Sequence, residues 1–366
     1  NPPDAPLKWP RPRMINLYNC ENVLIEDLTI LDSPAWTVHI VYCNDVTVDN
    51  ITIRSPYESH NTDGINPESS SNVRISNCYI DTGDDCITIK SGYNEYGREV
   101  GIPCENIVVT NCIFKNGRGG VVVGSEMSGG VNNITVSNCV FDGTLRGLRI
   151  KTARGRGGYV ENYQASNLVM RNIIDAAFSI TTSYGGGGDG EIPPVTEKTP
   201  KLRNVQWGDI IIVESNKVAD IGGLPEMPLS DFTLTNIQAE SVKEGIFITY
   251  AENVYLNNII ANPEYGPALA MSNVENAEID RFVNQKPVPD MPVIQFTQVT
   301  DALLESCYAP ESTGTFMELI GVANKNIILN NNRLANARTE KMNVTEATGY
   351  IPAPAAVRET IQEELG

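Results

Sequence analysis

The chain has 366 residues, of which 45 are acidic and 27 basic, so its formal net charge is −18. Such a surface repels nucleic acid and anionic membranes, so neither is expected as a partner. No apolar run is long enough to cross a bilayer, and the residues from Asn1 to Pro12 contain no apolar segment typical of a signal peptide. The length is ample for a sizeable core.

The elements predicted along the chain come from a degenerate repeat. Its mark is an Asn or Asp followed by alternating hydrophobic residues. The mark occurs at Asn22, Asp45, Asn72, Asn106, Asn133, Asn167, Asn204, Asn253 and Asn326. Up to Asn204, successive marks lie about 23 to 37 residues apart. The period-2 alternation of β-branched residues predicts short strands with one buried face.

A unit of about 23 residues is too small to bury the apolar face of its own strands, so the units must stack into a solenoid. Equivalent residues of adjacent coils would lie about 4.8 Å apart, and the recurrent Asn fits a ladder of amides at a bend. The regular leucine pattern of a leucine-rich repeat is absent, as are the hairpin signals of propeller blades. We therefore predict an all-β fold, a single right-handed parallel β-helix.

We expect one domain over residues 1–366, with 337–366 as a C-terminal tail or capping segment. The stretch from Ala355 to Leu365 is the best helix candidate and would cover the exposed strand edges at that end of the solenoid. At the other end the repeat begins near Ile15, with no capping segment before it. The expectation there is that the chain has been trimmed, or that another subunit covers this end in a homo-oligomer.

Six of the eight cysteines recur at two positions of the repeat: Cys20, Cys43 and Cys104 at one, and Cys78, Cys112 and Cys139 at the other. Such recurrence favours small stacked core residues over disulfides. No CxxC or His/Cys spacing typical of a metal site occurs, so neither a metal nor a cofactor is expected. The redox compartment is left open.

Charge and glycine interrupt the strand pattern in four segments, which are Asn61–Gly64, Gly83–Cys86, Gly117–Gly120 and Arg149–Lys151. Asp63 and Asp84 are separated by about one coil. Because Cys78 and Cys112 occupy equivalent positions, Asp84 and Arg118, each six residues further on, should stack. Arg149 and Lys151 alternate onto one face of a later strand. The result is a stripe along the solenoid, acidic at one end and basic at the other.

The carboxyl groups of Asp63, Asp84 and Asp85 cannot all ionise freely at such short range, and at least one pKa should rise. A protonated carboxyl beside ionised ones suits glycosidic cleavage, and a separation of one coil leaves room for a water and favours inversion. Arg149 and Lys151 suggest an anionic ligand, for which a sugar acid is the simplest candidate. Calcium competes for clustered carboxylates, although the cationic neighbours argue against it.

With these motifs the sequence resembles the polygalacturonase family, the pectin-cleaving glycoside hydrolases with a parallel β-helix. The segments Asn61–Gly64, Gly83–Asp85 and Arg149–Lys151 look like three of the four signature segments of that family. The close match covers about residues 11–210, and a weaker solenoid similarity continues to about Asn336.

The resemblance implies a role for each acidic residue. Asp84 would be the general acid, Asp63 and Asp85 would activate the water, and Asn61 would help to orient Asp63. The segment Gly124–Gly130 looks like that of the bacterial, often exo-acting, branch of the family.

The same resemblance implies that Arg149 and Lys151 bind a galacturonate carboxylate and that Tyr184 lines the substrate cleft. One departure concerns the third signature segment, normally Gly-His-Gly, which here reads Gly117-Arg118-Gly119. Arg118 stays charged, so it cannot shuttle a proton, and it should lower the pKa of nearby carboxyl groups. This departure allows three outcomes. The activity is weaker or shifted to lower pH, or Arg118 recognises a different anionic sugar, or the chain binds its ligand without cleaving it.

The chain has only two histidines. His60 directly precedes Asn61, and our hypothesis is that it replaces the histidine missing from the third segment. His39 lies in a predicted strand, where we expect a structural role.

The expected function is inverting hydrolysis of α-1,4-galacturonosyl linkages of pectin or oligogalacturonides, in exo mode. Two alternatives stay open: a hydrolase of another acidic pectic glycoside, of the rhamnogalacturonan type, which Arg118 favours, and a noncatalytic carbohydrate-binding solenoid. A calcium-dependent lyase is a weaker rival. The expected partner is an acidic polysaccharide or oligosaccharide, which favours a secreted or periplasmic location. Loops at 91–103 and 183–200 could wall off subsites and decide between exo and endo action.

Overall fold

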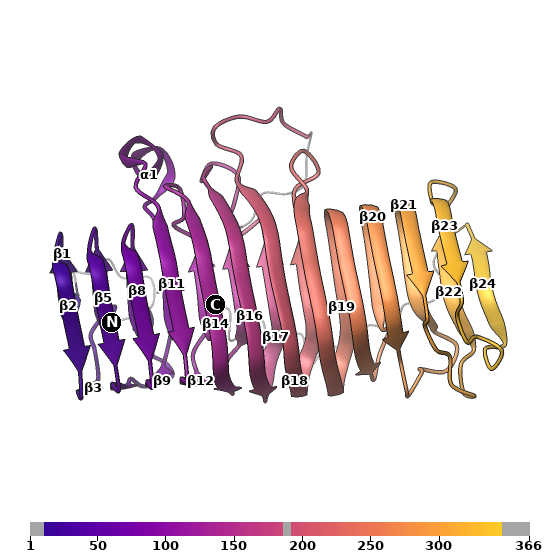
Figure 1. Cartoon of the computed structure of the whole chain (residues 1–366), viewed down its shortest axis with the longest axis horizontal. Helices are drawn as coiled ribbons and strands as arrows, with labels where there is room; N and C mark the ends of the chain where they lie inside the picture. The colour runs from indigo at the N-terminus through magenta and orange to yellow at the C-terminus, as the bar shows by residue number, and fades with distance from the viewer. Residues whose placement is uncertain (1–10, 186–191, 346–366) are drawn as a thin grey trace.

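The computed structural model describes residues 11–185 and 192–345, and these form a parallel β-solenoid (Figure 1). Every strand pairs in parallel with its equivalent in the next coil, and the pairs build three ladders. The predicted all-β parallel β-helix is thereby confirmed. Among the described residues, no helix has the length and apolar character needed to cross a bilayer.

The first ladder carries the site described below. It begins with β1 (Ile15–Tyr18), β4 (Val38–Val41), β7 (Ile65–Glu68), β10 (Ile87–Ile89), β13 (Val121–Gly124), β15 (Arg146–Lys151) and β17 (Ile173–Thr181). The second begins with β2 (Glu21–Glu26), β5 (Asn44–Asp49), β8 (Ser71–Ser76), β11 (Cys104–Thr110), β14 (Val131–Asp142) and β16 (Tyr159–Arg171). The third begins with β3 (Thr29–Leu31), β6 (Thr52–Arg54), β9 (Tyr79–Thr82) and β12 (Ile113–Asn116).

Several of the strands from β14 onward, such as β14 and β16, run unbroken through a bend and belong to more than one ladder. The later strands are β18 (Lys201–Gly222), β19 (Leu229–Pro263), β20 (Leu269–Val283), β21 (Pro292–Glu305), β22 (Thr315–Ile320), β23 (Lys325–Asn330) and β24 (Thr339–Val344). Strand β24 lies within the expected tail 337–366 and pairs with β22 as one more rung. The candidate helix Ala355–Leu365 lies outside the described residues, and the single-domain expectation stays a prediction.

Stacked apolar side chains fill the interior. Val73, Ile107, Ile134, Tyr163, Val205 and Phe232 occupy one register position on successive rungs, and all are buried. All eight cysteines are free thiols, and all but Cys20 are buried. Cys112 and Cys139 stack on neighbouring rungs, with the backbone N–H of Cys112 3.5 Å from Sγ of Cys139. The predicted role of these cysteines as small core residues is confirmed.

Two asparagine ladders run along the solenoid instead of the single one predicted. In the first, Nδ2 of Asn133 donates to Oδ1 of Asn106 at 3.0 Å, and Nδ2 of Asn162 donates to Oδ1 of Asn133 at 3.1 Å. Asn167 belongs to the second ladder, where it donates to Asn138 at 3.3 Å. Each of these residues has φ between 55° and 58°, the left-handed conformation that Asn tolerates at a bend.

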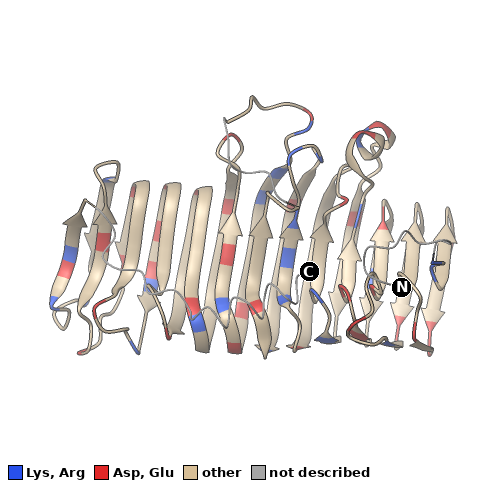
Figure 2. Cartoon of the chain, turned by 180° about the vertical axis from the view of Figure 1, so that it is seen from behind, with Lys and Arg blue, Asp and Glu red and all other residues tan. Residues whose placement is uncertain are grey.

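The predicted loop 91–103 contains a helix, α1 (Asn94–Val100). Gly101 ends it with φ 62°, and its N–H bonds to the carbonyl of Gly97, which is a common helix C-terminus. Figure 1 shows α1 and the segment after β17 projecting from the same edge of the solenoid. Asp and Glu residues occur along the whole length of the solenoid (Figure 2).

Candidate active site

Strand register places two of the candidate acids on neighbouring rungs. Asp63 and Asp85 each lie two residues before Ile65 and Ile87, which pair between β7 and β10. The N–H of Gly64 donates to the carbonyl oxygen of Asp85 at 3.0 Å. A Cβ on Gly64 would approach that segment to 2.4 Å, so only glycine permits this spacing.

Asp84 occupies the accessible position of the three. It is half-buried at the rim of a cavity of about 230 Å³, here named the acid pocket. The pocket is lined by His60, Asn61, Asp84, Arg118, Leu145, Arg149, Lys151 and Tyr184. The backbone N–H groups of Asn61 and Asp85 donate to the two carboxyl oxygens of Asp84 at 3.0 and 2.9 Å, so its orientation is fixed.

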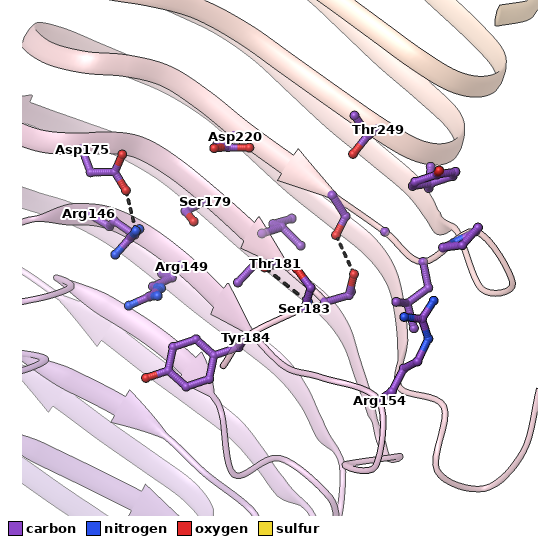
Figure 3. Close-up of a pocket in the computed structure, with 17 residues that line it drawn as sticks. Arg146, Arg149, Arg154, Asp175, Ser179, Thr181, Ser183, Tyr184, Asp220 and Thr249 are labelled. Atoms are coloured by element: carbon purple, nitrogen blue, oxygen red, sulfur yellow. Dashed lines mark hydrogen bonds and ion pairs between the residues drawn. The ribbon is translucent and has the colours of Figure 1, made fainter. Parts of the chain in front are cut away.

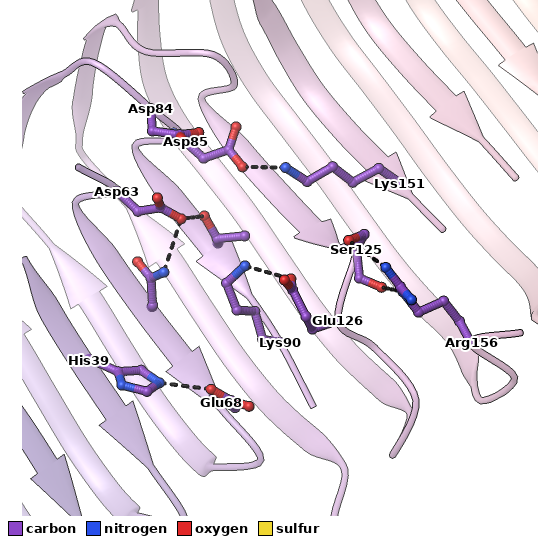
Figure 4. Close-up of polar contacts among 12 residues, drawn as sticks. His39, Asp63, Glu68, Asp84, Asp85, Lys90, Ser125, Glu126, Lys151 and Arg156 are labelled. Carbon is purple, nitrogen blue, oxygen red and sulfur yellow. Dashed lines mark hydrogen bonds and ion pairs between the residues drawn. The ribbon is translucent and has the colours of Figure 1, made fainter. Parts of the chain in front are cut away.

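Asp63 and Asp85 lie deeper, and both are almost completely buried. Oδ2 of Asp63 accepts hydrogen bonds from Asn66 and Thr88, each at 3.0 Å (Figure 4). Oδ2 of Asp85 pairs with Nζ of Lys151 at 2.7 Å. Oδ1 of Asp85 is buried and accepts no hydrogen bond from any described residue.

The environment separates the pKa values of the three carboxyl groups. Burial and, after it, the charge of Asp84 raise the pKa of Asp63 to about 7. Burial and the charge of Asp85 raise the pKa of Asp84. Burial also opposes ionisation of Asp85, but the charges of Lys151 and Arg149 outweigh it and lower its pKa. The site therefore places carboxyl groups of raised and lowered pKa side by side.

The cationic end of the site is organised by Tyr184. The guanidinium of Arg149 lies 5.4 Å and the ammonium of Lys151 5.3 Å from the centre of its ring. Both cations are nearly buried. Because Lys151 is paired with Asp85, Arg149 is the cation that can bind an external anion.

Arg118 stacks on Asp84 as its spacing predicts, since its backbone N–H donates to the Asp84 carbonyl at 3.2 Å. Its side chain lines the acid pocket. The expected lowering of nearby pKa values does not prevail at Asp84, whose pKa is raised by burial and by Asp85. Gly119 is required here, because a Cβ would come within 2.3 Å of Cγ2 of Val122 and 3.1 Å of Oδ1 of Asp85.

His60 is exposed and lies at the mouth of the acid pocket. Nη1 of Arg11 donates to the backbone oxygen of His60 at 2.6 Å, and Nη2 donates to Oδ1 of Asn61 at 2.9 Å. Arg11 thus fixes the turn that carries both candidates. Nothing in the pattern around Arg11 had marked it as part of the site.

Sequence reasoning also missed a buried pair beside Asp63. Nζ of Lys90 bonds Oε2 of Glu126 at 2.8 Å (Figure 4). It also lies 4.6 Å from the ring centre of Trp36. The signal was available, since Lys90 directly follows β10 and alternates onto the same face as Thr88. His39, expected to be structural, is buried with its ring nitrogens 3.0 Å from Asn16 and 2.8 Å from Glu68.

Calcium was the competing explanation for the acidic cluster. Over residues 11–185 and 192–345, no group of three or more His, Cys, Asp or Glu side chains is arranged to hold a metal ion.

Comparisons with known proteins agree with this geometry. The family model described as "Glycosyl hydrolases family 28" matches residues 7–254. A probable polygalacturonase of Vitis vinifera is 36% identical over 232 residues, which are 63% of this chain and 47% of that protein. An endo-polygalacturonase of Pectobacterium carotovorum subsp. carotovorum is 35% identical over 211 residues, 57% of this chain and 49% of that protein.

Among solved structures, a hyperthermoactive exopolygalacturonase from Thermotoga maritima aligns with a TM-score of 0.58 and 33% identity, over 68% of this chain and 55% of that one. Both endo- and exo-acting proteins are therefore among the relatives. The chain spans about half the length of the curated relatives that it matches.

Proposed function

The chain belongs to family 28 of the glycosyl hydrolases, and we propose that it hydrolyses α-1,4-galacturonosyl linkages of pectin or oligogalacturonides with inversion. One observation carries this proposal. Asp84, with a raised pKa, faces the acid pocket, while Asp85, with a lowered pKa, lies beneath it on the same rung. A proton donor at the rim of the cavity and an acid of lowered pKa buried beneath it are thus adjacent.

In the proposed reaction, Asp84 donates its proton to the glycosidic oxygen as the bond to the leaving sugar breaks. Asp85 accepts a proton from a water, which attacks the anomeric carbon from the opposite face. We assign that role to Oδ1 of Asp85, which has no hydrogen-bond partner among the described residues. Asp63, held by Asn66 and Thr88, is the second acceptor in this proposal. The ionisation of Asp63 is coupled to that of Asp84, so the two carboxyl groups together retain a proton.

Arg149 binds the carboxylate of a galacturonate unit in this proposal, with Lys151 and Tyr184 fixing its position. The charge of Arg149 is sequestered from water, which strengthens its attraction for a carboxylate. His60, at the pocket mouth, stands in for the histidine that Arg118 replaces.

Exo action, as in a bacterial exo-type enzyme, is the mode we propose. The support is a wall on one side of the groove, made by α1, by Gly124–Gly130 and by the segment 152–158. Arg156 ties it together, because Nε of Arg156 donates to the carbonyl of Ser125 at 2.9 Å and Nη1 donates to Oδ1 of Asn94 at 2.5 Å. The likeness to the Thermotoga maritima exopolygalacturonase also supports this mode.

A hydrolase of a different acidic pectic glycoside, of the rhamnogalacturonan type, is the second candidate. It is favoured by Arg118, an additional cation in the wall of the acid pocket where the family motif has histidine.

The test is a reducing-sugar assay on polygalacturonate and on rhamnogalacturonan-type oligosaccharides, with products identified by mass and the new anomer by NMR. We expect galacturonate monomers of inverted configuration from polygalacturonate, and no release by Asp84→Asn. Products of many lengths would indicate endo action. Release only from the second substrate would favour the second candidate, and binding without release would indicate a noncatalytic solenoid.

A further inference from the structure

A larger cavity of about 650 Å³ continues the groove from the acid pocket toward the C-terminal coils (Figure 3). Arg149 and Tyr184 line both cavities. Beyond them its wall offers the hydroxyl groups of Ser179, Thr181 and Thr249, and we name it the hydroxyl cavity.

Arg149 stands at the boundary between the two cavities with an unused donor. Its Nε is buried and has no hydrogen-bond partner among the described residues, and its guanidinium forms no ion pair with any of them. A buried guanidinium group with an unused donor is a strong site for a carboxylate.

Within two rungs of Arg149, the charged groups of the groove form ion pairs. Register pairs Arg149 with Ser179 and Ser179 with Asp220, which places Asp220 about 10 Å along the groove. Nζ of Lys217 bonds Asp220 at 2.9 Å, and Nη2 of Arg146 bonds Asp175 at 2.5 Å.

Beyond Arg149, the cations of this region already have carboxylate partners. Arg146 pairs with Asp175, and Lys217 pairs with Asp220. Burial opposes the charge of Lys217, but Asp220, Asp175 and Glu244 outweigh it and raise its pKa. At the far rim, Arg154 is neutralised by Glu226 through two contacts of 2.6 and 2.8 Å. A second anionic sugar unit entering here would find no further cation among the described lining residues that is not already paired.

We propose that the hydroxyl cavity is a subsite for an uncharged sugar unit, adjacent to the unit whose carboxylate binds Arg149. This inference rests on the proposed function and narrows its substrate to chains in which charged and uncharged units are neighbours. Hydroxyl groups of Ser179, Thr181 and Thr249 exchange hydrogen bonds with the unit, and no carboxylate is brought against Asp220. Two sources share this chemistry: methyl-esterified galacturonate and a neutral sugar.

The test compares three galacturonans of matched length. One is fully de-esterified, one is partly methyl-esterified, and one has part of its carboxyl groups reduced to hydroxymethyl groups. Catalytic efficiency is measured for the wild type, for Asp220→Asn and for Glu252→Gln, which removes an exposed carboxylate from the second ladder. Binding of the three samples to Asp84→Asn is measured by calorimetry.

We expect the wild type to prefer a partly neutral chain. Preference for the methyl-esterified chain alone would identify methyl-esterified galacturonate as the ligand. Equal preference for the esterified and the reduced chain would show that any uncharged sugar unit is accepted. Asp220→Asn should raise efficiency on the fully acidic chain about three-fold, the scale of one half-exposed charge pair, while Glu252→Gln changes nothing. A wild type that prefers the fully acidic chain, with Asp220→Asn unchanged, would overturn the inference. Absence of hydrolysis with the same order of affinities would reject the proposed function and leave the subsite supported.

Discussion

Nζ of Lys151 lies 2.7 Å from Oδ2 of Asp85, although 66 residues separate them in the chain. Both side chains are nearly buried, so the pair is shielded from solvent. The contact crosses an intervening strand, β13, in which Gly124, the residue paired with Lys151, has no side chain. Lys151 therefore compensates the charge of Asp85 directly.

Replacing Lys151 with Met should leave Asp85 as an uncompensated buried charge. Its pKa would rise, so the acid limb of the pH profile of kcat should move to higher pH, and activity should fall about 100-fold or more. Lys115→Met, which breaks the more exposed pair with Asp142, is the matched control. An acid limb that stays in place in Lys151→Met would contradict the role assigned to this pair.

Asp63 should make stability depend on pH in a direction opposite to that of most carboxylates. Its pKa is about 7 in the folded protein against an ordinary 3.8, so the folded state binds the proton more tightly. The stability it contributes is full below about pH 3.8 and is lost as pH rises toward 7. Urea unfolding of Asp63→Asn should therefore show a gain over the wild type that grows across this window, by up to a few kcal/mol.

Asp49 supplies the control of opposite sign. Hydrogen bonds from Ser76 and Asn77 lower its pKa. Asp49→Asn should therefore lose stability relative to the wild type at neutral pH and regain parity in acid. Identical pH trends in the two variants would refute the assignment to Asp63.

His60 is proposed to take over the function of the histidine that Arg118 replaces. His60→Ala should then change the shape of the pH profile of kcat/KM, because the variant has no side chain at this position that can exchange a proton. Arg118→His in the same background should restore part of it. A His60→Ala profile that superimposes on the wild type would end this hypothesis.

Gly119 should tolerate no side chain. A Cβ would come within 2.3 Å of Val122 and 3.1 Å of Oδ1 of Asp85, which must then shift. Gly119→Ala should lower kcat by about 100-fold, since displacement by about 1 Å is costly at a reacting centre. Gly314→Ala, where no heavy atom lies within 4 Å of the added carbon, should be nearly neutral in stability and activity.

The asparagine ladder should contribute to stability at each rung. Asn133 accepts from Asn162, donates to Asn106 and has φ 56°. Asn133→Ala should lower the free energy of unfolding by about 1–3 kcal/mol through lost hydrogen bonds and backbone strain. Asn133→Gly, which removes only the hydrogen bonds, should cost less. Equal losses in the two variants would show that the backbone conformation contributes nothing.

The repeat in the sequence predicted the coils because one residue type does the same physical task at every bend. That strength also produced an error, since Asn167 and Asn133 look alike in sequence but stand at different corners, with Asn162 the true neighbour of Asn133. Only the pairing of strands separates the two ladders.

The acidic and basic residues of the site could be found from their spacing because register in a solenoid converts sequence intervals into distances. The spacing of Cys78 and Cys112 was enough to stack Arg118 on Asp84. Glu126 and Arg11 lie in segments outside the strand repeat. Their spacing in the sequence therefore does not determine their position in space, and it could not predict that they reach the site. The direction of each pKa shift likewise depends on how deeply the carboxyl group is buried, and the sequence alone does not give that.

The segments that flank the groove leave the solenoid at its bends, whereas the reacting groups are held by strand registry. Added residues in α1 or in 152–158 would therefore displace no rung. The loops at the entrance to the groove can therefore vary among related enzymes without disturbing the strands that hold the reacting groups. New recognition loops could be grafted at the same places.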